Sequence, residues 1–233
     1  MRNNTIISGL FLTLLMFLSS ACGSGGGSSE SRDTTMLNQE ISKRTYKLYP
    51  ENYLNTGYSE EYSLAGTIDD NTTVNAKLKI SMVGESNQHE KTSFFTEQTL
   101  DLFFSDGSTK NRRIINDSSL SKAIHSRIYP GNNNNINNTI KDTPLPDSAE
   151  IGAFGVLFEA INLDGNTETT SWALEYGGNN NVKLIIQTEI KNIEHQIVYF
   201  ENISFGINQK GERQNVSLYL EYPFEDIILR LKQ

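Results

Sequence analysis

The stretch Val182-Lys183-Leu184-Ile185-Ile186-Gln187-Thr188-Glu189-Ile190 decides the fold, because apolar and polar side chains alternate along most of its length. A period of two is typical of a β-strand that buries one face and exposes the other to water. Residues 76–82 and 216–222 have the same alternation. We therefore expect each of these three stretches to form an amphipathic strand.

Short turn signals separate the alternating stretches, and Asp-Gly between two apolar runs is a strong local indication of a hairpin. The signals are Asp69-Asp70-Asn71, Ser105-Asp106-Gly107, Asp164-Gly165-Asn166, Gly177-Gly178-Asn179 and Lys210-Gly211. No convincing long helical pattern interrupts them. The sequence therefore predicts an all-β fold of antiparallel meanders, with about ten or eleven strands.

Two arrangements of these strands stay open. Phe94-Phe95 and Phe103-Phe104 each place one ring on either face of a strand, so one ring of each pair is either exposed or covered by a second layer. If both faces are buried, a two-sheet sandwich is expected. A barrel is the alternative, either open or closed around an interior ligand cavity.

Some strand faces can be assigned in more detail. Val198 and Phe200 have one parity, whereas Ile203 and Phe205 have the other, which predicts a β-bulge near Glu201-Asn202.

Aromatic side chains also share strand faces. Trp172, Leu174 and Tyr176 lie on one face, and Phe158 and Val156 share a face of the preceding strand. We expect core packing for these side chains, with a platform that stacks on a sugar or another ligand as the alternative.

The chain contains a weak internal sequence repeat. Residues 76–94 align with residues 182–200 at a constant offset, which suggests two similar halves, 61–129 and 149–233. A loop rich in Pro and Asn, residues 130–148, would join them, because proline removes a donor from a strand ladder. The simpler explanation is that two amphipathic strands always look alike.

The N-terminal residues have the pattern of an export signal. An apolar run, Ile6–Leu18, follows Arg2 and leads into Leu18-Ser19-Ser20-Ala21-Cys22. A secretory signal has this order of a basic start, an apolar core and small residues. The run is shorter than the roughly 20 residues of a membrane-spanning helix. An ordinary cleaved signal and an uncleaved helix are the alternatives to lipidation.

This N-terminus resembles the lipobox of bacterial lipoproteins, in which the cysteine is diacylated and becomes the new N-terminus. Cys22 is the only cysteine of the 233 residues, so lipidation would also account for an odd thiol in an exported protein. Ser19 departs from the commonest motif, which has Leu three residues before the cysteine. The resemblance implies that Cys22 is the lipid attachment site and that the membrane is a partner through this lipid.

The same resemblance implies a domain plan and a location. Residues 1–21 would be the signal peptide, residues 22–45 the lipidated cysteine with a flexible Gly/Ser tether, and residues 46–233 one β-rich domain. In Gram-negative lipoproteins, Asp after the cysteine favours retention in the inner membrane. Gly23 therefore implies the outer membrane, with the leaflet left open.

The charge and the rare residues argue against several functions. The net charge of −8 argues against nucleic-acid binding, because binding to phosphates requires a basic surface. The histidines are His89, His125 and His195; the first and last lie in polar segments typical of exposed turns, and no nucleophile elbow accompanies them. Close sets of zinc ligands are absent from the sequence. We expect no catalytic, cofactor or metal residues.

Acidic clusters have ordinary explanations. Asp69-Asp70-Asn71 and the segment Asp164–Glu168 lack the alternating carboxylates of a calcium loop, so turn chemistry is expected. Glu60-Glu61 is the type of pair that a glycosidase needs about 5–9 Å apart, but solvated charge is the default interpretation.

Three functions are therefore weighed. The first is a non-catalytic envelope β-domain that binds an envelope or extracellular partner or serves a structural role. The second is a lipocalin-like carrier of a small apolar ligand, and the third a hydrolase of envelope polysaccharide. The segment Leu145–Gly152 and the tryptophan strand after it resemble the layout of small β-rich envelope lipoproteins, which brings no activity with it.

Overall fold

The computed structural model describes residues 43–55, 57–69, 71–88, 91–119, 123–129, 138–178 and 181–233. This part of the chain consists of strands and turns, so the all-β prediction is confirmed. None of its residues forms a helix long and apolar enough to cross a membrane.

The strand count within the described residues is higher than expected, because short strands escaped the pattern. The bounds are β1 (Thr45–Lys47), β2 (Ser59–Ile68), β3 (Thr72–Gln88), β4 (Lys91–Phe104), β5 (Thr109–Ser119), β6 (Ile124–Ile128), β7 (Asn138–Asp142), β8 (Ser148–Glu150), β9 (Phe154–Ile161), β10 (Thr167–Gly178), β11 (Asn181–Lys191), β12 (Ile197–Ile207), β13 (Arg213–Tyr222) and β14 (Ile227–Lys232). The segment 130–148 therefore contains strands as well as loop.

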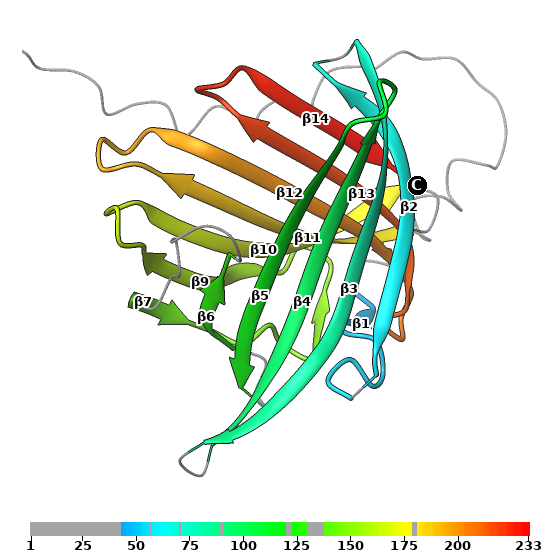
Figure 1. The fold of residues 1–233 in the computed structure, drawn as a ribbon. Coiled ribbons are helices and arrows are strands. Elements are labelled where there is room, and N and C mark those ends of the chain that lie inside the picture. The colour runs from blue at the N-terminus through cyan, green and yellow to red at the C-terminus, as the bar shows by residue number, and fades with distance from the viewer. Residues whose placement is uncertain are drawn as a thin grey trace, which may run out of the picture. The chain divides into compact units, whose positions relative to one another are not determined.

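Twelve of these strands form one antiparallel sheet in the order β6-β5-β4-β3-β2-β14-β13-β12-β11-β10-β9-β7, and β1 pairs with β8 in a small second sheet. The large sheet curls until its two edge strands, β6 and β7, lie side by side without a shared ladder (Figure 1). We call this junction the seam. The open-barrel alternative is confirmed and the two-sheet sandwich is not formed.

The two faces of the sheet differ as a barrel requires. Phe94 is buried on the inner face, whereas its neighbour Phe95 is only half-buried. Phe104 packs against the core, and Phe103 is exposed. One ring of each pair thus faces inward, and no second sheet of the described residues covers the outer ring.

Cross-strand pairs place apolar side chains from neighbouring strands on the inner face. Leu78 lies opposite both Tyr62 and Leu100, and all three are buried. Leu184 lies opposite Phe205 in the same way. Such opposed pairs are the units that stabilise a sheet, and together they form the barrel core.

The sheet consists of two meanders, β2–β6 and β9–β14, together with β7, which pairs with β9 at one edge; β14 joins the meanders by pairing with β2. The aligned residues 76–94 fall in β3 and β4, and residues 182–200 fall in β11 and β12. The sheet strands that come first and last in the chain, β2 and β14, are therefore neighbours within the sheet. Its two edge strands, β6 and β7, come from the middle of the chain.

Two assignments of strand face were wrong. The β11–β12 ladder is regular from Val182↔Ile207 to Ile190↔Tyr199, so the bulge lies at Val198 and not near Glu201-Asn202. Glu201 has the same parity as Ile203 and points inward. The alternation pattern leads one to expect an apolar residue at such a position.

The second error concerns β9. The register against β10 shifts between Thr170 and Ser171, so Phe158 pairs with Thr170 but Val156 pairs with Ser171. This irregularity puts Val156 and Phe158 on different faces.

The two ends of the barrel are built differently. At one end, which we call the turn end, lie the hairpin turns β2–β3, β4–β5, β9–β10, β11–β12 and β13–β14. At the other end, residues 45–55 pack with residues 143–153. The Leu48 amide donates to the Asp147 carbonyl at 3.0 Å, and the side chains of Leu48 and Leu145 are buried in the core.

Candidate functional site

The inner face of the barrel carries charges among its apolar side chains. Three arginines on three strands each pair with a glutamate from another strand. The pairs are Arg112–Glu201 (β5 and β12), Arg127–Glu168 (β6 and β10) and Arg213–Glu60 (β13 and β2). The positive and negative charges of this interior set balance.

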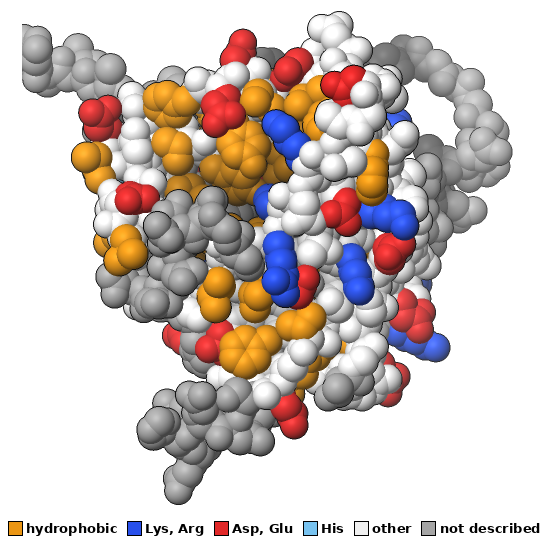
Figure 2. Space-filling model, viewed as in Figure 1, with side chains coloured by type: hydrophobic (Ala, Val, Ile, Leu, Met, Phe, Trp, Pro, Cys, Tyr) orange, Lys and Arg blue, Asp and Glu red, His pale blue; other side chains and the backbone are white. Residues whose placement is uncertain are grey.

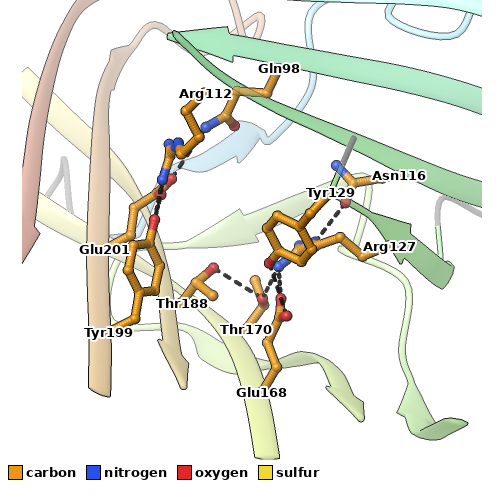
Figure 3. A network of polar contacts seen from close by, with 10 residues as sticks. All are labelled: Gln98, Arg112, Asn116, Arg127, Tyr129, Glu168, Thr170, Thr188, Tyr199 and Glu201. Carbon is orange, nitrogen blue, oxygen red and sulfur yellow. Dashed lines mark hydrogen bonds and ion pairs between the residues drawn. The ribbon is translucent and has the colours of Figure 1, made fainter. Parts of the chain in front are cut away.

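We call each ion pair, together with its hydrogen-bond partners, a centre. In the first centre Glu201 is the acceptor, and Figure 3 shows Arg112, Gln98 and Tyr199 converging on it. Arg112 donates to both the Glu201 carboxylate and the Tyr199 hydroxyl, and Gln98 donates at 3.2 Å. Burial raises the pKa of the Glu201 carboxyl, but the Arg112 charge and these hydrogen bonds outweigh burial and hold the pKa below its usual range. Glu201 is therefore ionised at neutral pH.

Arg127 forms the second centre, also drawn in Figure 3, by reaching from edge strand β6 to β10. It donates to the carboxylate of Glu168, which is 1% exposed, and to the Thr170 hydroxyl at 3.0 Å. Its Nε donates to Asn116 Oδ1 at 2.8 Å, and the Tyr129 hydroxyl donates to Glu168 at 2.9 Å. Because β6 and β10 are not neighbours in the sheet, these side chains connect the two sides of the seam.

Arg213 forms the third centre, near the end where residues 45–55 pack. Its Nη1 donates to Glu60 Oε2 at 2.7 Å, and Glu60 also accepts from the Tyr62 hydroxyl at 2.9 Å. The guanidinium carbon lies 4.2 Å from the ring centre of Phe205 and 5.6 Å from that of Tyr53. The Arg213 side chain is only 6% exposed, yet its buried Nε has no hydrogen-bond partner among the described residues.

A cavity of about 130 Å³ lies inside the barrel and touches all three centres. Glu201, Arg127 and Arg213 contribute polar groups to its wall, and Leu184 and Ile203 are among its apolar side chains. The molecular surface also has a hollow over β12 and β13 where hydrophobic side chains gather beside basic ones (Figure 2). A mostly apolar cavity with a few convergent polar groups is the usual form of a small-molecule site.

The residues singled out in the sequence lie elsewhere or outside the described residues. Cys22 and His89 are outside them, and so is the side chain of His125, whose backbone lies in β6. His195 is exposed in the β11–β12 turn with a positive φ of 62°, which confirms it as a turn residue. Asp164 also lies in a turn, where its amide donates to the Asn162 side chain at 3.0 Å.

Glu60 and Glu61 do not act as a pair, because they are on opposite faces of β2. Glu61 is solvated as expected, with only an exposed contact to Lys77 at 3.3 Å. Glu60 differs from the expectation, because it points inward to Arg213. The described residues contain no group of three or more His, Cys, Asp or Glu side chains placed to hold a metal ion.

The aromatic strand is core, as expected, at Trp172 and Leu174 but not at Tyr176. Trp172 and Leu174 are buried on the inner face, and Phe158 is fully buried opposite Thr170. Tyr176 is half exposed at the end of β10, where the ladder to β11 becomes irregular.

The turn end carries a separate surface feature. Leu163, Ile193 and Phe224 are large apolar side chains at the tips of three of its turns, and all three are exposed. The exposed carboxylates Asp164, Glu194, Glu225 and Asp226 occupy the same turns. We refer to this feature as the apolar rim.

The interior charges were not predicted, although the sequence carried a signal for them. Glu168 has the same parity as Trp172 and Leu174, and Glu201 has the same parity as Ile203. A charged residue that shares its parity with the inward-facing apolar residues points into the barrel, where its partner comes from another strand. The partner itself depends on the closure of the sheet and cannot be read from the local pattern.

Comparison of the chain with protein-family models, with curated proteins and with solved structures found no match.

Proposed function

We propose that this protein is a lipid-anchored, non-catalytic envelope protein whose barrel carries a small ligand in its interior cavity. The observation that supports this function best is that the cavity borders three ion pairs, each with at least one buried side chain, instead of a uniformly apolar core. Replacing buried ion pairs by apolar side chains is often neutral or stabilising. Stability alone therefore gives little reason for this interior, whereas ligand orientation does.

The lipid anchor is the other part of the proposal, and it is supported by the sequence of residues 1–29. Changing Cys22→Ala should release the chain from the membrane fraction, since no acyl chain can then be attached. A variant that stays membrane-bound and unprocessed would contradict the anchor but leave the carrier function intact.

A co-purified ligand is the direct test of the carrier function. The full chain would be purified from membranes and its bound small molecules released and identified by mass spectrometry. Ile186→Phe should lower the amount recovered, because Ile186 lines the cavity. Ile185→Phe is the matched control, because the adjacent position in β11 has the opposite parity. Recovery of no ligand from the wild-type protein, or equal recovery from both variants, would overturn the proposal.

Partner binding is the second candidate function, and the apolar rim favours it. Exposed Leu163, Ile193 and Phe224 gather at one end of the barrel, and gathered exposed apolar residues mark interaction sites. Changing all three to Ser should abolish co-purification of a partner without affecting the fold. Unchanged co-purification would exclude the rim as the contact.

A further inference from the structure

The size of the cavity limits what it can hold. An engineered protein cavity of about 150 Å³, lined by Leu, Ile and Phe, binds benzene. The interior cavity of this barrel has about 130 Å³. A single six-membered ring with a small substituent fills such a space, whereas a long acyl chain does not fit without opening the barrel.

The charges around the cavity select for an uncharged occupant. Arg112, Arg127 and Arg213 each already pair with one glutamate inside the barrel. An anionic ligand would add a negative charge, and the three arginines of the described interior are already paired with glutamates. A cationic ligand would add the opposite imbalance. Burying an unpaired charge is strongly unfavourable, so a neutral molecule is the class that the interior tolerates.

Among the described residues that line the cavity, one has a buried donor without a hydrogen-bond partner. The Nε of Arg213 is buried and has no hydrogen-bond partner among the described residues, and Arg213 lines the cavity. Arginine has only donors, so the complementary group is an acceptor such as a carbonyl oxygen. Phe205 also lines the cavity and stacks on the same guanidinium, which gives a flat apolar ring a surface to pack on.

Resting on the carrier function above, we infer that the cavity binds an uncharged molecule of single-ring size that carries a hydrogen-bond acceptor, with Arg213 Nε as the donor. Aryl ketones and aryl amides have this chemistry.

Three fluorinated probes separate the requirements, and ¹⁹F NMR of the full chain measures their binding. 4-Fluoroacetophenone is neutral with an acceptor, fluorobenzene is neutral without one, and 4-fluorobenzoate is anionic. We expect 4-fluoroacetophenone to bind at least tenfold more tightly than either of the others. Equal or tighter binding of 4-fluorobenzoate or fluorobenzene, or binding of none of the three, would overturn the ligand class.

The donor is tested by Arg213→Lys, which keeps a positive charge beside Glu60 but removes Nε. It should weaken 4-fluoroacetophenone binding at least fivefold and leave fluorobenzene binding unchanged. Arg230→Lys is the matched control, because Arg230 stacks on Tyr219 at 5.5 Å on the outer face of the sheet. An unchanged preference in Arg213→Lys would exclude this donor, and if the variant fails to fold, the ranking of the three probes still decides the class.

These outcomes are separable from those of the carrier function. A co-purified charged or long-chain molecule would support the carrier function and overturn the neutral single-ring class. The absence of both a co-purified ligand and probe binding would overturn both.

Discussion

Buried arginines define the interior at the scale of single residues. Each one combines a glutamate partner with further contacts: Arg112 with Tyr199, Arg127 with Asn116 and Arg213 with the Phe205 ring. The planar guanidinium suits this use, because it can pair with a carboxylate and stack on an aromatic ring at the same time. The ammonium group of lysine is a point charge and has no planar face for bidentate pairing or stacking.

The first prediction concerns the loss of one partner from such a pair. Glu201→Gln should lower the free energy of unfolding by about 3 kcal/mol, because Arg112 is left as a buried charge without its counterion. Glu61→Gln is the control; Glu61 and Lys77 are both 53% exposed, and an exposed pair contributes about 1 kcal/mol or less. Urea unfolding measures both changes, and equal effects would contradict the prediction.

The second prediction concerns acid. Because the pKa of Glu201 is lower in the folded protein than in the unfolded chain, the unfolded chain takes up the proton first as the pH falls. The pair therefore stabilises the fold fully above the unfolded-state pKa of about 4.3, and this contribution is lost as the pH falls through the lower, folded-state pKa. The difference in stability between wild type and Glu201→Gln should shrink below about pH 4.3. A difference that is constant from pH 7 to pH 3 would contradict this.

At the scale of elements, asparagine-based turns hold several hairpins in register. Asn162, Asn192 and Asn208 each begin a five-residue turn, and each side-chain oxygen accepts from the backbone amides two and four residues later. Asparagine is suited to this because its short side chain reproduces a backbone turn. A turn of fixed length fixes the register of the strands on either side.

The pairing of β2 with β14 depends on a residue without a side chain. A Cβ atom on Gly66 would lie 1.7 Å from the carbonyl oxygen of Arg230, which is backbone and cannot move aside. Gly66→Ala should therefore destabilise the protein by roughly 2–3 kcal/mol. Gly84→Ala in β3 is the control, because a Cβ there meets nothing within 4 Å. Thermal unfolding compares the two variants, and a neutral Gly66→Ala would refute the close approach.

The strands could be predicted from the sequence because their signals are local. The alternation in residues 182–190 and the Asp-Gly turns depend only on neighbouring residues, and the structure confirms them. The position of Glu201 was misread because an inward charge breaks the apolar pattern. Its partner Arg112 lies 89 residues away in sequence, so only the closed sheet reveals the pair.

At the scale of the whole sheet, the described residues of the two meanders are joined by a backbone ladder only through β14 and β2, and the separate β1–β8 ladder adds a second link between residues 45–47 and 148–150. A cut between β6 and β7 therefore leaves each meander intact. Two co-expressed fragments, residues 1–133 and 134–233, should assemble and co-purify, because the inner faces of both meanders are apolar.

The control is a cut between Lys210 and Gly211 in the β12–β13 turn. It separates a fragment of only two strands, and an isolated hairpin is marginal in water, so less assembled protein is expected. Equal yields of assembled protein from both cuts, judged by size-exclusion chromatography, would contradict the prediction.

The seam has a consequence for rates. Because the described residues of β6 and β7 share no ladder, separating these two strands breaks side-chain contacts such as Arg127–Glu168 but no ladder hydrogen bond between them. We therefore expect the sheet to open at the seam more readily than the protein unfolds, so that a ligand bound in the interior would exchange with solvent faster than the protein unfolds. The residence time of such a ligand would then depend on the polar contacts at the seam, and substituting Arg127 or Glu168 should shorten it.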